Sequence, residues 1–212
     1  MASPTRPQPR VESSREYLLR LILRLIASAG REAQPAMFAH VHPHGHATAR
    51  VAVHLASAVM PNVRKGTRPF HELAFGAHVH DIGKYLVRTE VLLKPDRLDE
   101  EEYALVAMHP VYGANILSNF AGMTDAIRRI VLHHHEHWDG TGYPEGLCGA
   151  AIPLEARVVA VADVYTSLRA RRSYKATLRK PDACRELAGM AGRELDPQLV
   201  DDFIRLIGGE GA

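Results

Sequence analysis

The chain has 212 residues, of which 46% are apolar and 24% are charged, a composition typical of a soluble globular domain. Its net charge of +2 gives no reason to expect a nucleic-acid polymer as a partner. The two cysteines, Cys148 and Cys184, match no disulfide framework, so we expect free thiols in a reducing compartment. Thirteen histidines stand beside one tryptophan and five phenylalanines, which indicates metal or proton chemistry rather than aromatic packing.

The first thirty residues predict a tail and then a helix. Residues 1–14 contain three prolines and few apolar side chains, so they predict a flexible tail. Residues 15–29 predict a helix with the apolar stripe Leu18, Leu21, Ile22, Leu25 and Ile26. This stripe fits packing against a core, and it also fits a dimerisation or partner-docking helix, so a homodimer stays open. Arginines interrupt the run, which is too short to span a bilayer. With no targeting signal apparent, we expect a cytoplasmic protein without a membrane partner.

The remainder of the chain predicts a series of helices. A loop over 31–45 carries His40, His42 and His44. Apolar periodicity then predicts helices over about 46–60, 70–83, 100–119, 123–135, 153–170, 181–193 and 197–207, separated by prolines. No stretch alternates as a strand would. We therefore expect one all-α domain over 15–212.

Histidine and aspartate extend the apolar face of the helix predicted over 70–83. Leu73 and Ala77 lie on that face at helical spacing, and His80 and Asp81 continue it. A carboxylate on a core-facing stripe is costly unless it is paired or bound to a metal. By itself, this pair fits a hydrogen-bonded core pair equally well.

Three further helices present the same residue types. Leu105 leads at helical spacing to His109, the stripe through Ile130 leads to His134 and His135, and Asp163 lies inside an apolar helix. Each case alone also fits a buried, satisfied side chain, but together they indicate a metal site. Imidazole and carboxylate without thiolate suit Fe, Mn, Zn or Ni. Six such ligands are too many for one tetrahedral ion, so we expect two divalent ions bridged by a carboxylate.

The same residues carry a family resemblance. His80-Asp81-Ile82-Gly83-Lys84 resembles the signature of HD-domain phosphohydrolases, and the run from His134 to Pro144 resembles the longer signature of their HD-GYP subgroup. The segments between and after these motifs also match the subgroup's pattern: Leu92–Pro95, His109-Pro110, Ile152–Leu154, Ala162–Tyr165 and Arg172–Lys175. The resemblance extends from about residue 40 to the end of the chain.

The resemblance implies an all-helical fold around a central metal cluster. It also implies hydrolysis of cyclic di-GMP to linear pGpG, with further cleavage to GMP as an option, usually with iron or manganese. One ion would be held by His80, Asp81, Asp163 and an upstream histidine. The second would be held by His109, His134 and His135, with Asp81 bridging.

The resemblance assigns substrate contacts as well. Lys84 would touch a substrate phosphate, and a segment containing Arg172, Tyr174 and Lys175 would hold the other phosphate region. The Gly142-Tyr143-Pro144 loop would shape the rim of the site and contact a signalling protein. An ammonium three residues after Asp81 can act as a point charge beside a metal-bound phosphate.

The upstream histidine departs from the family pattern by one residue. We choose His46 because it opens the predicted helix that contains Val53 and Ala56, and His44 is the competitor. Members with three metals carry a glutamate four residues before this histidine, and here His42 holds that position. This departure argues against a third ion, although His42 stays open as a ligand.

The expected mechanism is attack on phosphorus by a metal-bridging hydroxide, with Asp81 and Lys84 as the catalytic residues. Two alternatives remain. One is an enzyme for another cyclic dinucleotide or a nucleotide. The other is a non-catalytic module that binds cyclic di-GMP or docks a partner, and its expected mark, loss of metal ligands, is missing from this sequence.

Overall fold

The computed structural model describes residues 35–120, 122–170 and 177–209, without the side chains of residues 35–40 and 42. The chain divides into two units at residue 34, and all described residues belong to the second. The predicted tail over 1–14 and the predicted helix over 15–29 therefore lie outside the described residues. So do Arg172, Tyr174 and Lys175.

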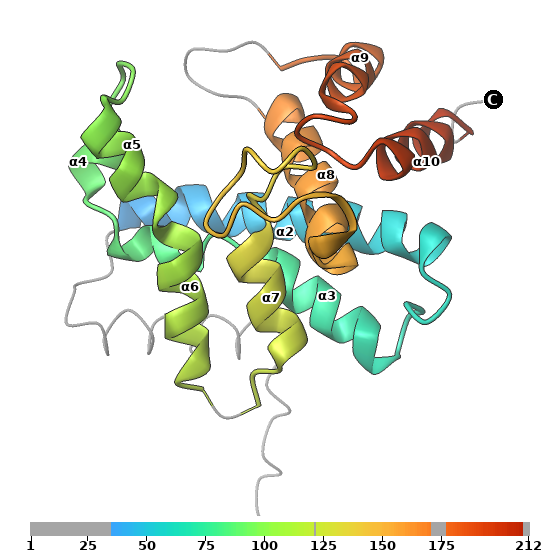
Figure 1. The fold of residues 1–212 in the computed structure, drawn as a ribbon, viewed down its shortest axis with the longest axis horizontal. Helices are drawn as coiled ribbons and strands as arrows, with labels where there is room; N and C mark the ends of the chain where they lie inside the picture. Colours follow the sequence, from blue (N-terminus) through green and yellow to red (C-terminus); the bar gives the residue numbers. More distant parts are fainter. Residues whose placement is uncertain (1–34, 121, 171–176, 210–212) are drawn as a thin grey trace, which may run out of the picture. The chain divides into compact units, whose positions relative to one another are not determined.

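Three helices form the centre of this unit: α2 (Pro35–Val59), α3 (Arg68–Val79) and α8 (Leu154–Arg169) (Figure 1). Helix α2 packs against both α3 and α8. Leu55, Leu73 and Val158, one from each helix, are almost fully buried in the core. Helices α9 (Lys180–Met190) and α10 (Pro197–Gly208) pack on one another and on α8, and Phe203 joins them to the core.

The segment after α3 builds the other side of the site. It comprises the 3₁₀ turn η1 (Ile82–Leu86), α4 (Thr89–Leu92), α5 (Glu100–Ala107), α6 (His109–Ser118) and α7 (Asp125–His133). Helix α6 packs on η1 and α7, and α7 packs on α3. A long connection containing the 3₁₀ turn η2 (Gly149–Ala151) then leads to α8. Among the described residues, no β-strand occurs, which confirms the all-α prediction.

Side-chain caps fix where several of these helices begin. Thr67, Thr124 and Asp196 accept hydrogen bonds from backbone N–H groups in the first turns of α3, α7 and α10. At α5, Asp99 and Glu102 form a reciprocal capping box. These local bonds satisfy N–H groups that have no partner inside the helix.

The first described helix differs from its prediction. We expected a loop over 31–45, but α2 already begins at Pro35 and includes Pro43 and Gly45. A side chain at Gly45 would collide with the backbone carbonyl of His78 in α3. Gly45 therefore permits close packing of two helices, whereas the sequence suggested a loop.

Two other predicted helices also have different boundaries in the structure. The helix predicted over 70–83 ends at Val79, so His80 and Asp81 lie at its end and not within it. The helix predicted over 100–119 is interrupted at Met108, and Leu105 is 43% exposed. The apolar stripe that led us to His109 is therefore not a core stripe. His109 is buried at the start of α6, which packs on η1 and α7.

No described helix has the length and apolar character that a membrane crossing requires.

Candidate metal centre

Two groups of potential metal ligands lie at the meeting point of α2, α3, α6, α7 and α8. Asp81, His109, His134 and His135 form the first group, and His44, His80 and Asp163 form the second. Within each group the ligand atoms all lie within 4.8 Å of one another. The helices thus bring together residues separated by up to 119 positions in the chain.

Asp81 contacts both groups. Its Oδ1 lies 3.2 Å from His109 Nε2 and 3.8 Å from His134 Nε2. Its Oδ2 lies 3.5 Å from His80 Nε2 and 2.7 Å from Lys84 Nζ. One carboxylate oxygen faces each group, which is the arrangement that a bridging ligand requires.

Backbone carbonyls orient three of the histidines in the same way. The Nδ1 atoms of His80, His109 and His134 lie 2.7, 2.7 and 2.8 Å from the carbonyl oxygens three residues before them. A carbonyl can only accept, so each Nδ1 carries a hydrogen, and the neutral ring offers the lone pair of Nε2. This bond is the usual device that fixes the tautomer of a metal-binding histidine.

Without a cation, the acceptor atoms of the first group lack donors. His109 Nε2 and His134 Nε2 lie 3.3 Å apart, yet each presents a lone pair when its ring is neutral. Asp81 Oδ1 is buried and has no hydrogen-bond partner. Buried acceptors that converge without a donor are costly. The residues present therefore fit a divalent metal ion.

The electrostatics of the first group favour neutral imidazoles. Burial lowers the pKa of His134 to about 4, although Asp81 opposes this change. Burial, together with His134 and His109, also lowers the pKa of His135 well below its ordinary value. Neutral rings are the form that binds metals, so these two side chains need not lose a proton at neutral pH.

The acids and His80 respond to opposite charges. Burial raises the pKa of Asp81, but the charges of Lys84 and His80 outweigh it and hold the pKa well below the ordinary value. Burial likewise raises the pKa of Asp163, and its bonds to His44 and His80 lower it further than burial raises it. Burial lowers the pKa of His80, but Asp81 and Asp163 raise it to about 9. Both carboxylates are thus ionised and available as ligands.

The structure places His44, and not His46, in the centre. His44 Nε2 lies 2.6 Å from Asp163 Oδ1, whereas His46 is exposed and its ring lies 6.0 Å from that of His78. The choice of His46 is therefore replaced by its competitor. The reason is the earlier start of α2: His44 lies four residues before buried Thr48, on the buried face of that helix.

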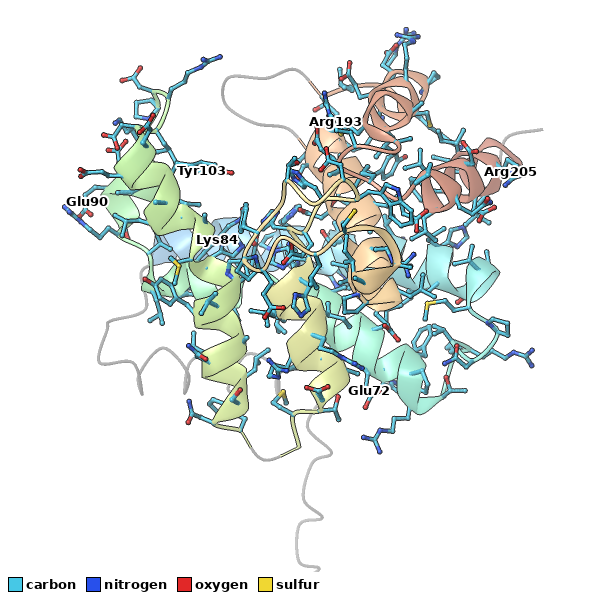
Figure 2. The ribbon with its side chains drawn as sticks, viewed as in Figure 1. Glu72, Lys84, Glu90, Tyr103, Arg193 and Arg205 are labelled. Carbon is cyan, nitrogen blue, oxygen red and sulfur yellow. The ribbon has the colours of Figure 1, made fainter. Side chains whose placement is uncertain are left out.

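Among the other predicted site residues, the structure describes the side chain of Lys84 but not those of His42, Arg172, Tyr174 and Lys175. Lys84 extends from η1 to Asp81, close to the centre, and its side chain is 26% exposed (Figure 2). The side chain of His42 is outside the described part, so its candidacy stays a prediction. The same is true of the segment over 171–176, which contains the predicted phosphate contacts.

Glu136 is a site-building residue that the sequence analysis did not single out. Its carboxylate is completely buried and accepts hydrogen bonds from the backbone N–H groups of Glu145 (2.7 Å) and Leu147 (3.0 Å). The Tyr143 N–H donates to the carbonyl of His135, and the Tyr143 ring stacks on the His135 ring. Glu136 thus ties the loop over 138–148 to the end of α7. The sequence did offer a signal for Glu136, because it directly follows the candidate ligands His134 and His135 in the motif.

Together, the fold and the centre define a helical protein with a histidine–carboxylate site compatible with divalent metal ions. The family model described as "HD domain" matches residues 33–199, and the chain belongs to this family. Its motifs are those of the HD-GYP subgroup.

The chain is similar to several known proteins. It is 39% identical over 153 residues to the cyclic di-GMP phosphodiesterase response regulator RpfG of Xanthomonas campestris pv. campestris, covering 72% of this chain and 40% of that protein. It is 39% identical over 124 residues to 3'3'-cGAMP-specific phosphodiesterase 2 of Vibrio cholerae, covering 58% of this chain and 24% of that protein. The chain thus spans less than half the length of these relatives.

Among solved structures, Bd1817, an HD-GYP-type protein from Bdellovibrio bacteriovorus, superposes with a TM-score of 0.65 at 20% identity. The match covers 91% of this chain and 60% of that chain, and it supports the helical fold.

Proposed function

We propose that this chain is a metal-dependent phosphodiesterase that hydrolyses cyclic di-GMP to linear pGpG. The observation that carries the proposal is Asp81, whose two oxygens face two separate groups of ligands. The names of the relatives support the substrate class.

We further propose two divalent ions, iron or manganese in preference to zinc or nickel. His109, His134 and His135 would hold one ion, and His44, His80 and Asp163 the other, with Asp81 shared. Bound in this way, the ions would acidify a water molecule and withdraw charge from the phosphate. His42 remains a proposed additional ligand, and we expect no third ion.

The chain's own residues prepare the site for a phosphodiester. Lys84 Nζ lies 2.7 Å from Asp81 Oδ2, so it holds the carboxylate ionised and fixes its direction. The same ammonium group is part-exposed, so it can also face a substrate phosphate. Arg172, Tyr174 and Lys175 are proposed to bind the second phosphate region.

The test is a cleavage assay combined with metal analysis. Protein prepared without oxygen would be loaded with Fe(II) or Mn(II), its ions counted, and its products from cyclic di-GMP separated by chromatography. We expect about two ions per chain and formation of pGpG. Tight binding of cyclic di-GMP with full metal loading and no product would instead show a non-catalytic binding module.

A second candidate substrate is 3'3'-cGAMP, because one of the relatives is named as specific for it. The same assay with both cyclic dinucleotides, and with cyclic di-AMP, decides between them through kcat/KM. A clear preference for a substrate other than cyclic di-GMP would correct the proposed substrate and leave the metal chemistry in place.

The remaining proposals concern partners. We propose that the Gly142-Tyr143-Pro144 loop, at the rim of the site, also contacts a signalling protein, that the chain can form a homodimer, and that it acts in the cytoplasm. Sedimentation with and without the first 34 residues tests the dimer.

A further inference from the structure

A series of aromatic rings leads from the metal centre to the surface. The rings of His134 and His135 lie 4.2 Å apart between centroids, and Tyr143 stacks on His135 at 5.0 Å with 29° between the planes. Tyr103 of α5 then meets Tyr143 edge to face at 6.4 Å. The outermost ring is therefore linked by direct contacts to a candidate metal ligand.

Tyr103 is exposed although it is large and aromatic. Tyr103 is 56% exposed, and α5 has no fully buried residue. In Figure 2 its side chain extends away from α5, toward the side on which the loop over 138–148 lies. An exposed aromatic ring is suited to stacking against a planar group.

The charges around Tyr103 indicate which part of a substrate it meets. Helix α5 begins with Glu100, Glu101 and Glu102, and Lys94 pairs with the last of these at 2.5 Å. An acidic first turn repels phosphate groups. It does not repel an uncharged heteroaromatic base. Lys84, on the other hand, lies near the metal centre, where phosphate would bind.

We propose that Tyr103 is a substrate-binding residue that stacks on a nucleobase of the cyclic dinucleotide while its phosphate lies at the metal centre. This inference rests on the proposed function. Tyr143 provides the adjoining wall, and the contact of its ring with His135 fixes the distance between the base site and the metal site. Stacking requires the ring of Tyr103 and not its hydroxyl group.

Three variants test this role. Tyr103→Ala removes the ring, Tyr103→Phe keeps it, and Leu105→Ala is the matched control because Leu105 is an exposed apolar residue of the same helix. Each would be assayed with cyclic di-GMP and with methyl p-nitrophenyl phosphate, a small phosphodiester without a nucleobase. Circular dichroism and metal content would be recorded for every variant.

We expect Tyr103→Ala to raise the KM for cyclic di-GMP about tenfold, the size of effect known for loss of one base–aromatic stack, with kcat nearly unchanged. Tyr103→Phe and Leu105→Ala should match the wild type. Hydrolysis of the small phosphodiester should be the same in all four proteins.

Two results would overturn the inference while the proposed function stands. One is wild-type KM in Tyr103→Ala, which is also the result expected if Tyr103 serves a protein partner. The other is an equal loss on both substrates, which would show a structural role. If the wild type cleaves the small phosphodiester but no cyclic dinucleotide, the proposed function itself fails and the base site with it.

Discussion

The two ligand groups of the centre are held differently. In the first group, the side chains of His109 and His134 are at most 1% exposed, and backbone carbonyls fix both rings. In the second group, the side chains of His44 and Asp163 are 21% and 16% exposed. A backbone carbonyl also fixes His80 of the second group, so the difference is one of burial: one ligand of four, His135, is partly exposed in the first group, against two of three in the second. Comparing them suggests that the buried subsite should release its metal more slowly.

Asp81 belongs to both halves of this comparison, so its loss should have the largest effect. Asp81→Ala should reduce cyclic dinucleotide hydrolysis by roughly a thousandfold and lower the metal content of both subsites. The helical fold should persist, which circular dichroism would show. Retention of two bound ions and substantial activity would refute the bridging role.

The second group depends on His44, and the variant pair His44→Ala and His46→Ala tests this directly. His44→Ala should lower metal affinity and activity by about a hundredfold or more. Mutating a residue that only hydrogen-bonds to a metal ligand already costs about tenfold to a hundredfold. His46→Ala is the matched control, and it should retain activity because its ring is exposed and lies beside His78. The elemental metal content of each variant is the measurement. The reverse outcome would restore His46 as the ligand.

Glu136 connects the first group to the loop over 138–148. Glu136→Gln replaces one accepting oxygen with an NH₂ group that would face a backbone N–H, so the loop should loosen. We expect activity on cyclic di-GMP to fall about tenfold, with bound metal largely retained. The control is Glu145→Gln, since the exposed side chain of Glu145 takes no part in these bonds. Equal kinetics for the two variants would contradict the role of Glu136.

The smallest expected effect is the pH dependence of the stability of the metal-free protein. The pKa of His80 is raised to about 9, so its charged form stabilises the fold fully below pH about 6.5, and this stability is lost as the pH rises toward 9. The pKa of His134 is lowered to about 4, so stability also falls as the pH drops from 6.5 toward 4. Thermal unfolding of chelator-treated protein should therefore show a maximum near neutral pH. His80→Ala should flatten the alkaline side.

Most of the centre followed from the sequence. The helical periodicity and the motifs around His80, Asp81, His134 and His135 predicted an all-α fold and these candidate ligands, because residue types and spacing carry that information directly. Pairing His109 with these residues also came from the motifs, although the apolar stripe through Leu105 that supported it is exposed in the structure.

Other features depended on contacts between distant segments. The choice between His44 and His46 turned on where α2 begins, and Pro43 and Gly45 resemble loop residues until α3 is seen packed against that glycine. The hydrogen bonds of Glu136 and the ring contact of Tyr103 both depend on the loop over 138–148, which lies far from Tyr103 in the chain. Local sequence sets which atoms a side chain offers and the face of a helix on which it lies. The packing of helices across more than a hundred residues decides which of those atoms meet.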